Sequence, residues 1–256
     1  MEIGIALSGG AARGLVHLGI LKALEELQIS LSIIAGTSSG AIMGALYAYG
    51  YPPDEILQIV INTKLFKLIR PGIGKSGLLK MDAAEKVYLQ YFPENSFSAL
   101  EKKLIVTAID LNTGKLCYFS EGELIKPLMA SSSLPIIFAP VQIGNAFYID
   151  GGLLNNLPVE PLLDKCDKII GAHCNPISEE FTARGFKAIF ERTFLLIINS
   201  NTFESRKYCD LFIEPPSLGQ FSILDLAKAQ EIFEIGYQYT LGMQPQLEAL
   251  RGATFQ

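Results

Sequence analysis

The chain has 256 residues, enough to bury one large core, and 49% of them are hydrophobic whereas only 18% are charged. Its net charge of −5, without a long run of Lys or Arg, argues against nucleic acid as a partner and against strong electrostatic binding to an anionic membrane. The high apolar content predicts buried parallel strands, or an apolar surface for a lipid or a partner.

The N-terminal residues, MEIGIALSGG, begin as a strand and lack a basic leader, a long apolar stretch and a small-residue cleavage site, so we expect no signal peptide. No apolar run approaches the roughly 20 residues that a membrane-spanning helix needs. The four cysteines have no metal-ligand spacing, and we expect reduced thiols in a cytoplasmic protein. These cysteines are Cys117, Cys166, Cys174 and Cys209.

Short apolar runs alternate with helical patterns along the chain, as in layered α/β proteins. The first part predicts strands over 3–7 and 32–35 and helices over 14–28, 41–50 and 54–64. Later strands are predicted over 104–110, 115–120, 146–150, 168–174 and 209–215, and later helices over 81–91, 123–131, 179–199 and 223–250. We therefore expect one domain, residues 1–256, folded as a three-layer α/β/α sandwich with a mostly parallel central sheet.

The segment GTSSG, residues 36–40, matches the G-x-S-x-G pattern of a nucleophile elbow. The pattern alone is weak, but here it follows a predicted strand and opens a predicted helix, the setting that lifts a serine hydroxyl above a sheet. Gly36 and Gly40 would leave room beside the central Ser38, and the helix N-terminus would favour developing negative charge. Ser39 is the alternative nucleophile, although it does not occupy the central place.

A second glycine-rich turn, SGGAARG at 8–14, follows the first predicted strand in the same way. Two neighbouring parallel strands would bring both turns to one sheet edge, so this turn could offer backbone N–H groups to an oxyanion. The alternative is a phosphate-binding turn of a nucleotide protein. The turn has neither dinucleotide-binding nor P-loop spacing, and we favour the oxyanion interpretation.

The chain has two histidines that could serve a nucleophilic serine as base. His17 lies one turn into the first predicted helix, which is typical of a packing or capping residue. His173 ends a predicted strand, and the order Ser38, Asp150, His173 would satisfy a Ser–Asp–His triad. Only two strands precede this elbow, however, whereas several precede the elbow of a typical α/β-hydrolase.

Two aspartates end predicted strands and are the carboxylate candidates. Asp150 is followed by Gly151 and Gly152, so the backbone can turn sharply there and aim the carboxylate at the sheet edge. Asp110 competes by position, but nothing around it forms a comparable turn.

Together these segments resemble the patatin-like phospholipase family, which pairs a catalytic serine directly with an aspartate. LSGGAARGLVHLGIL (7–21) is similar to the family's oxyanion segment, and GTSSGAI (36–42) to its serine elbow. ASSSLP (130–135) and YIDGGLLNNLPV (148–159) resemble its central A-S-x-x-x-P stretch and its D-G-G/A segment. The resemblance covers the first 160 residues well, and the last third of the chain carries little diagnostic signal.

The resemblance implies Ser38 as nucleophile and Asp150 as base. It implies an oxyanion hole from the backbone around Gly9, Gly10 and Ala11, with Arg13 holding or supplementing that loop. Gly36, Gly40, Gly151 and Gly152 would support these motifs. The chain departs from the family at Ala11, where members often carry a third glycine; if that position needs a positive φ, alanine costs about 1–2 kcal/mol.

The implied function is hydrolysis of lipid acyl esters by a serine acyl hydrolase of phospholipase, lysophospholipase or esterase type. The alternatives are an acyltransferase, which would use His173, and a lipid-binding protein without efficient catalysis. We expect no metal or other cofactor, and no D-x-D-x-D-G calcium loop is present. The expected partner is the lipid substrate, with transient membrane contact through the basic and apolar segment 64–80 or, alternatively, an ordinary solvated loop there.

Overall fold

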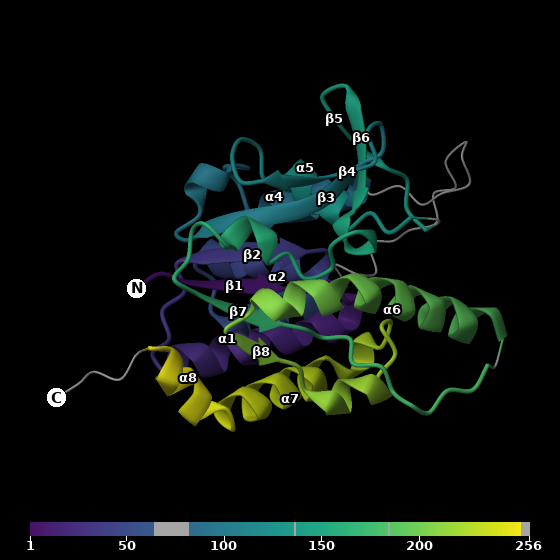
Figure 1. The fold of residues 1–256 in the computed structure, drawn as a ribbon. Helices are drawn as coiled ribbons and strands as arrows, with labels where there is room; N and C mark the ends of the chain where they lie inside the picture. The colour runs from purple at the N-terminus through teal and green to yellow at the C-terminus, as the bar shows by residue number, and fades with distance from the viewer. Residues whose placement is uncertain (64–81, 136, 184, 252–256) are drawn as a thin grey trace.

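The computed structural model describes residues 1–63, 82–135, 137–183 and 185–251, in which strands and helices alternate (Figure 1). The strands are β1 (Ile3–Leu7), β2 (Ile33–Thr37), β3 (Lys103–Asp110), β4 (Lys115–Phe119), β5 (Val141–Ile143), β6 (Ala146–Asp150), β7 (Lys168–Ala172) and β8 (Leu211–Ile213). The helices are α1 (Val16–Glu26), α2 (Ser39–Ala48), α3 (Pro53–Thr63), α4 (Asp82–Tyr91), α5 (Ile125–Ser131), α6 (Gly185–Ser205), α7 (Ala229–Leu241) and α8 (Gln244–Leu250). The segment 64–80 lies outside the described residues.

The strands of the described chain form a single sheet whose centre is parallel. β8, β7, β1, β2 and β3 run side by side in parallel, and β4 and β6 pair antiparallel with β3. β5 pairs antiparallel with β6 through a hairpin turn at Gly144, which has φ 60°. The expected mostly parallel α/β sheet is therefore confirmed, with an antiparallel edge built from hairpins.

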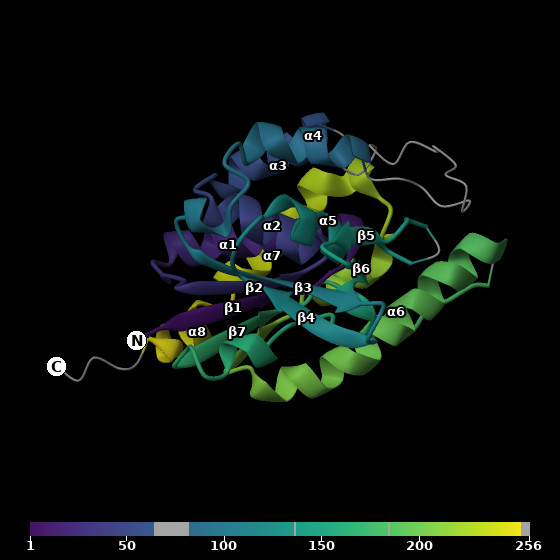
Figure 2. The same ribbon diagram turned by 90° about the horizontal axis from the view of Figure 1, so that it is seen from above.

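Helices cover the two faces of the sheet unequally. Helices α1, α2, α3, α4, α5 and α7 lie on one face, and α6 lies on the other (Figure 2). The first layer contains the larger core, in which α1 packs closely on α7. A smaller core on the opposite face joins side chains of β1, β2 and β7 to Leu157, Val159 and Leu162, which follow β6 in the chain. The three-layer α/β/α arrangement follows from burying both faces of a parallel sheet.

The pairing along β3 brings two distant segments together. Thr37, the last residue of β2, pairs with Thr107, and Asp150, the last residue of β6, pairs with the next residue, Ala108. Because β2 runs parallel to β3 and β6 runs antiparallel to it, the two strands end facing each other. The residue after β2 is Ser38, so the sheet itself sets Ser38 beside Asp150.

Several boundaries differ from the expected ones. The region 223–250 is two helices rather than one, because the chain turns at Gly242–Met243 and Pro245 lies in the first turn of α8, where its missing N–H is not needed. α6 starts later and ends later than the 179–199 pattern indicates. β5 is three residues long, too short to show an alternating pattern in the sequence.

Candidate active site

Ser38 occupies a strained elbow between β2 and α2. Its backbone has φ 54° and ψ −124°, a combination that non-glycine residues rarely adopt and that costs roughly 1–3 kcal/mol. Its N–H donates to the Ser131 hydroxyl at 2.8 Å, which gives a structural role to the ASSSLP stretch. A side chain at Gly40 would place Cβ 2.3 Å from the Leu7 carbonyl oxygen, and one at Gly36 would lie 2.6 Å from Ala41 Cα. The elbow therefore requires both glycines.

Asp150 is a buried carboxylate, 3% exposed, at the end of β6. One carboxylate oxygen accepts the N–H of Gly152 at 2.8 Å, and the Ser38 side chain is a second hydrogen-bonding partner. Burial raises the pKa of Asp150 to about 6, against the opposing effect of these two hydrogen bonds. Gly151 leaves no room for a side chain, because Cβ there would lie 2.8 Å from the Thr107 carbonyl oxygen. The turn thus holds a buried carboxylate next to the serine.

The glycine-rich turn of residues 8–14 passes directly in front of Ser38. A Cβ at Gly9 would lie 2.9 Å from Ser38 Cβ, so the close approach of the two segments depends on that glycine. The Gly10 N–H does not face the space in front of Ser38 but donates to Ser39 Oγ at 3.0 Å. Ser39 is buried and holds the turn, which separates its role from that of a nucleophile.

Ala11 has the positive φ that its glycine-like position implied, at 48°. Neighbouring N–H groups in the turn are engaged, with Gly9 donating to Asn156 at 3.2 Å and Ala12 to Ile223 at 2.9 Å. Within the described chain, the Ala11 N–H has no protein acceptor, and Ala11 lines the cavity next to Ser38. An N–H without a protein acceptor beside a cavity is the kind of donor that an oxyanion hole needs.

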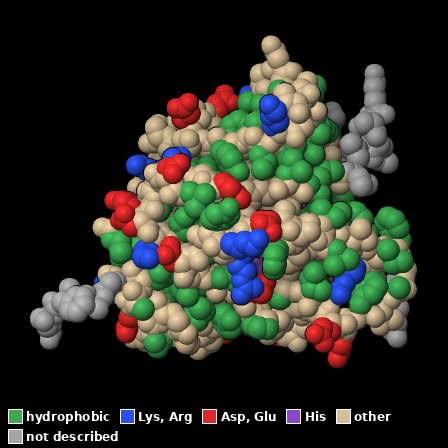
Figure 3. All heavy atoms as spheres, in the orientation of Figure 1, with side chains coloured by type: hydrophobic (Ala, Val, Ile, Leu, Met, Phe, Trp, Pro, Cys, Tyr) green, Lys and Arg blue, Asp and Glu red, His purple; other side chains and the backbone are tan. Residues whose placement is uncertain are grey.

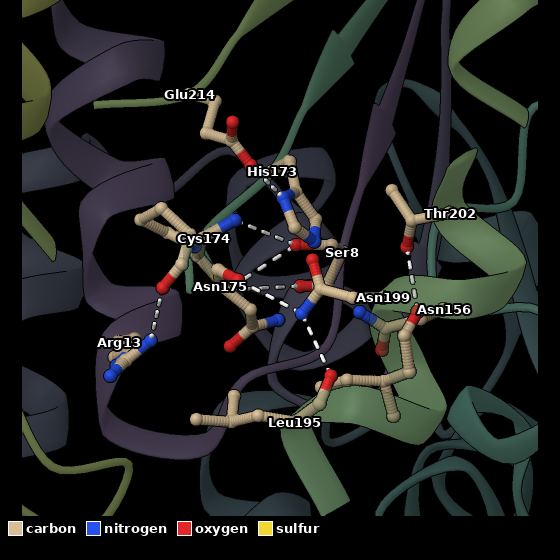
Figure 4. A network of polar contacts seen from close by, with 12 residues as sticks. Ser8, Arg13, Asn156, His173, Cys174, Asn175, Leu195, Asn199, Thr202 and Glu214 are labelled. Carbon is tan, nitrogen blue, oxygen red and sulfur yellow. Dashed lines mark hydrogen bonds and ion pairs between the residues drawn. The ribbon is translucent and has the colours of Figure 1, made fainter. Parts of the chain in front are cut away.

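Two asparagines, Asn156 and Asn175, both labelled in Figure 4, fix the turn through the Gly9 carbonyl oxygen. Asn156 donates to it at 3.1 Å and Asn175 at 2.6 Å, and both side chains are buried. No role is predicted for either residue from the sequence, although Asn156 lies in the segment YIDGGLLNNLPV. Their effect is to orient the Gly9–Gly10 peptide, and with it the following Ala11 N–H.

Helix α6 is hydrogen-bonded to both of these loops. The Asn201 amide donates to the Gly152 carbonyl at 3.0 Å and accepts the Asn156 N–H at 2.9 Å. Asn199 donates to the Asn175 carbonyl at 3.0 Å. The C-terminal half of α6 therefore braces the turn that carries Asp150 and the asparagines that hold the oxyanion turn.

Arg13 holds the glycine-rich turn from behind. Arg13 is 3% exposed, and its guanidinium donates to the carbonyl of Phe221, with Nε at 2.8 Å, and to that of Pro176 at 3.3 Å. Burial lowers the pKa of this guanidinium, although a nearby carboxylate and thiol favour the charged form. Arg13 is not among the described residues that line the cavity, and its hydrogen bonds join the glycine-rich turn to the loops of Pro176 and Phe221.

Neither histidine is among the described residues that line the cavity next to Ser38. The His17 ring donates from Nε2 to the Ser8 carbonyl at 2.8 Å, and burial lowers its pKa to about 4, so it is neutral. His173 is 1% exposed, with Nδ1 2.5 Å from Glu214 and its ring stacked on Phe212. Both rings serve packing and hydrogen bonding behind the strand ends.

Asp110, the competing carboxylate, closes the turn after β3. It accepts the Asn112 N–H at 2.8 Å and the Thr113 hydroxyl at 3.0 Å. Asp110 is not among the described residues that line the cavity. It is thus a turn residue, and Asp150 is the carboxylate that the structure brings to Ser38.

Ser38 and Asp150 open into one cavity of about 1070 Å³. Its polar end is formed by the glycine-rich turn, the elbow and Asn156. The remainder is mostly apolar and is lined by side chains from several helices and loops, including Ile42, Val60, Tyr88, Phe138, Phe190, Phe194 and Ile223. If a reacting group bound at the polar end, the apolar part of the cavity could therefore accommodate a long hydrophobic substituent attached to it.

No group of three or more His, Cys, Asp and Glu side chains within the described residues is arranged to hold a metal ion. Asp150 is the ionisable residue of the described cavity lining that is hydrogen-bonded to Ser38. Fold and site together define an α/β protein with a serine elbow facing a buried aspartate.

The chain belongs to the patatin-like phospholipase family, whose model matches residues 5–163. An uncharacterised NTE family protein of Mycobacterium tuberculosis is 29% identical over 164 residues, covering 63% of this chain and 45% of that protein. Lysophospholipase NTE1 of Scheffersomyces stipitis is 25% identical over 274 residues, covering 93% of this chain and 17% of that protein. The chain thus spans less than half the length of these relatives.

Two solved structures share the fold. VipD from Legionella pneumophila has a TM-score of 0.54 and 16% identity, over 97% of this chain and 67% of that one. The type III effector ExoU of Pseudomonas aeruginosa has a TM-score of 0.53 and 15% identity, over 96% of this chain and 53% of that one. At this level of identity the likeness concerns the fold, and it agrees with the central sheet and flanking helices described above.

Proposed function

We propose that this chain is a serine acyl hydrolase that cleaves lipid acyl esters through a Ser38–Asp150 dyad. The observation that supports it most is the meeting of a strained serine and a buried carboxylate at the polar end of a large apolar cavity. A raised pKa makes Asp150 a better proton acceptor than an exposed aspartate would be. Family membership and the lysophospholipase relative point to the same chemistry.

In the proposed reaction, Asp150 accepts the hydroxyl proton of Ser38 while Ser38 Oγ bonds to the ester carbonyl carbon. The Ala11 N–H stabilises the oxyanion, aided by the N-terminal N–H groups of α2 and the helix dipole. The C–O bond to the leaving alcohol then breaks, and the alcohol takes the proton from Asp150. Water repeats the sequence on the acyl-enzyme, releasing the fatty acid and restoring Ser38.

The pH dependence of kcat/KM should report the ionisation of Asp150. Because the ionised carboxylate is the base and burial raises its pKa to about 6, activity should rise about tenfold per pH unit below 6 and level off above it. Rates on an uncharged short-chain ester over pH 4–9 measure this. A flat profile across pH 5–7 would contradict Asp150 as the base.

His173→Gln separates a dyad from a triad. Gln keeps an amide near Glu214 in place of the imidazole, and His173 lies away from the described cavity lining. We expect kcat to stay within about threefold of the unmodified protein, since no proton passes through this ring. A collapse of kcat in a variant with an unchanged thermal unfolding midpoint would establish a triad instead.

A panel of acyl esters tests the proposed activity itself. It should include lysophosphatidylcholine, phosphatidylcholine and neutral monoacyl esters of several chain lengths, with released fatty acid measured by mass spectrometry. We expect hydrolysis of long-chain acyl esters, because the apolar cavity suits a long hydrocarbon substituent. Acyl transfer to added alcohols in preference to water would favour the acyltransferase alternative, and inertness throughout would favour a lipid-binding protein.

A further inference from the structure

Helix α6 exposes a stripe of large apolar side chains to solvent. Phe186 is 83% exposed, Ile189 49%, Leu196 51% and Phe203 66%. Spacings of three and seven residues put them along one side of the helix. The N-terminal end of α6 projects beyond the sheet and its other helices (Figures 1 and 2), and hydrophobic side chains gather on that side of the molecule (Figure 3). A contiguous apolar surface of this kind marks an interaction site.

The stripe continues directly into the cavity of Ser38. The rings of Phe186 and Phe190 stack with centroids 6.1 Å apart, and those of Phe190 and Phe194 at 6.5 Å. All three line the cavity, and Phe194 and Ala11 pack against the same small core of Leu195, Ile198 and Ile223. These three stacked rings, Phe186, Phe190 and Phe194, are called the aromatic ladder below. They lead from solvent to the turn in front of Ser38.

The rim of the cavity adds apolar groups from other parts of the chain. Leu224 is 56% exposed and Ile61 of α3 is 42% exposed, and both line the cavity. A hydrocarbon chain that enters beside α6 would therefore contact apolar groups over most of its path to Ser38. A surface that binds another protein would not need to be continuous with the cavity of Ser38. The continuity of the stripe with this cavity therefore favours a lipid over a protein partner.

The charged groups near the cavity entrance indicate which kind of lipid surface the stripe would bind. Among the described lining residues the charged groups are the carboxyls of Asp150, Glu191 and Asp225, with no Lys or Arg. Arg192 of α6 lies over the Phe181 ring at 5.3 Å and donates to the Ser178 carbonyl, and Lys207, just after α6, lies over the Phe203 ring at 5.2 Å and pairs with Glu204. An anionic lipid surface would be repelled by these carboxylates, whereas a zwitterionic one would not.

We propose that the exposed stripe of α6 is a docking surface for a zwitterionic lipid surface, and that the aromatic ladder guides an acyl chain from that surface to Ser38. The inference rests on the proposed lipid ester hydrolysis. Helix α6 would lie along the interface with its apolar side chains in the acyl region, without crossing it. No helix of the described residues is long and apolar enough to span a membrane.

The test measures binding separately from activity. Ser38→Ala protein, which leaves the lipid intact, is mixed with phosphatidylcholine vesicles or phosphatidylglycerol vesicles and the bound fraction is measured by flotation. We expect binding to phosphatidylcholine, and a decrease on the order of tenfold when Ile189→Ser and Leu196→Ser are added. Neither Ile189 nor Leu196 is among the described residues that line the cavity. The matched control is Leu111→Ser with Leu163→Ser, two leucines exposed by 47% and 40% elsewhere, which should bind normally.

With Ser38 present, I189S/L196S should lose hydrolysis of vesicle phospholipid in proportion to binding and keep its kcat/KM on a soluble butyrate ester within about twofold. Equal binding by the stripe variant and the control variant would overturn the proposal, as would a preference for phosphatidylglycerol. Conversion of a dimer to a monomer by I189S/L196S would assign the stripe to self-association. Vesicle binding without hydrolysis of any ester would instead contradict the proposed function while leaving the docking surface intact.

Discussion

Ser38→Ala should lower kcat by on the order of 10³–10⁶ and leave the fold intact. The serine hydroxyl is the atom that bonds to the acyl group in the proposed reaction, so no side chain nearby can replace it. Ser39, its neighbour, is buried and its oxygen accepts the Gly10 N–H at 3.0 Å. The elbow already forces a non-glycine residue to φ 54°, and alanine meets the same backbone cost as serine.

The measurement is steady-state hydrolysis of a soluble ester, together with the free energy of unfolding in denaturant. The matched control is Ser39→Ala, which removes an acceptor for the oxyanion turn and should reduce kcat far less than Ser38→Ala does. Near-normal turnover by Ser38→Ala, or a larger loss in Ser39→Ala with an unchanged free energy of unfolding, would contradict the assignment.

Asp150→Asn should reduce kcat at nearly the level of Ser38→Ala, because the amide keeps the shape of the side chain and cannot accept the proton. The Gly152 N–H that lies 2.8 Å from Asp150 Oδ1 can still donate to the amide oxygen. Since the two residues act as a unit, the double variant should be little slower than either single variant. Losses that multiply in the double variant would contradict a dyad.

The same substitution should make the protein more stable at pH 8. Burial raises the pKa of Asp150 from 3.8 to about 6 on folding, so the ionised carboxylate is disfavoured in the folded state. Stability attributed to this group is therefore highest below pH 4 and is lost as the pH rises to 6. Asn removes that penalty, and we expect a gain on the order of 1–3 kcal/mol in the free energy of unfolding at pH 8. A loss of stability there would show that the charged carboxylate stabilises the fold.

Local patterns were sufficient to predict the elements that carry the chemistry. Strand β2, the elbow and α2 follow one another without a gap, so the sequence around Ser38 predicts its own backbone setting. The turn at Gly151 and Gly152 likewise marked Asp150 as a carboxylate at a sheet edge. The contact between Ser38 and Asp150 could not be predicted from these local patterns, because the contact depends on β2 and β6 pairing with adjacent residues of β3.

The supports of the oxyanion turn were also beyond sequence reasoning. Asn156 and Asn175 both donate to the Gly9 carbonyl, yet they follow different strands and carry no local pattern. The Gly10 N–H was expected to face Ser38, and the Ser39 hydroxyl engages it instead. Such contacts arise from which loops meet at the end of the sheet, and hydrophobic periodicity carries no information about polar pairs between loops.

Reaction with a fluorophosphonate, followed by peptide mapping of the adduct, tests the central claim most directly. Such reagents modify a serine only when its oxygen is activated for attack, so labelling reports nucleophile and base together. We predict one adduct, on Ser38, formed faster above pH 6 than below it and strongly slowed by Asp150→Asn but not by His173→Gln. An adduct on Ser39 or another serine, or labelling at the normal rate in the Asp150→Asn variant, would contradict the dyad.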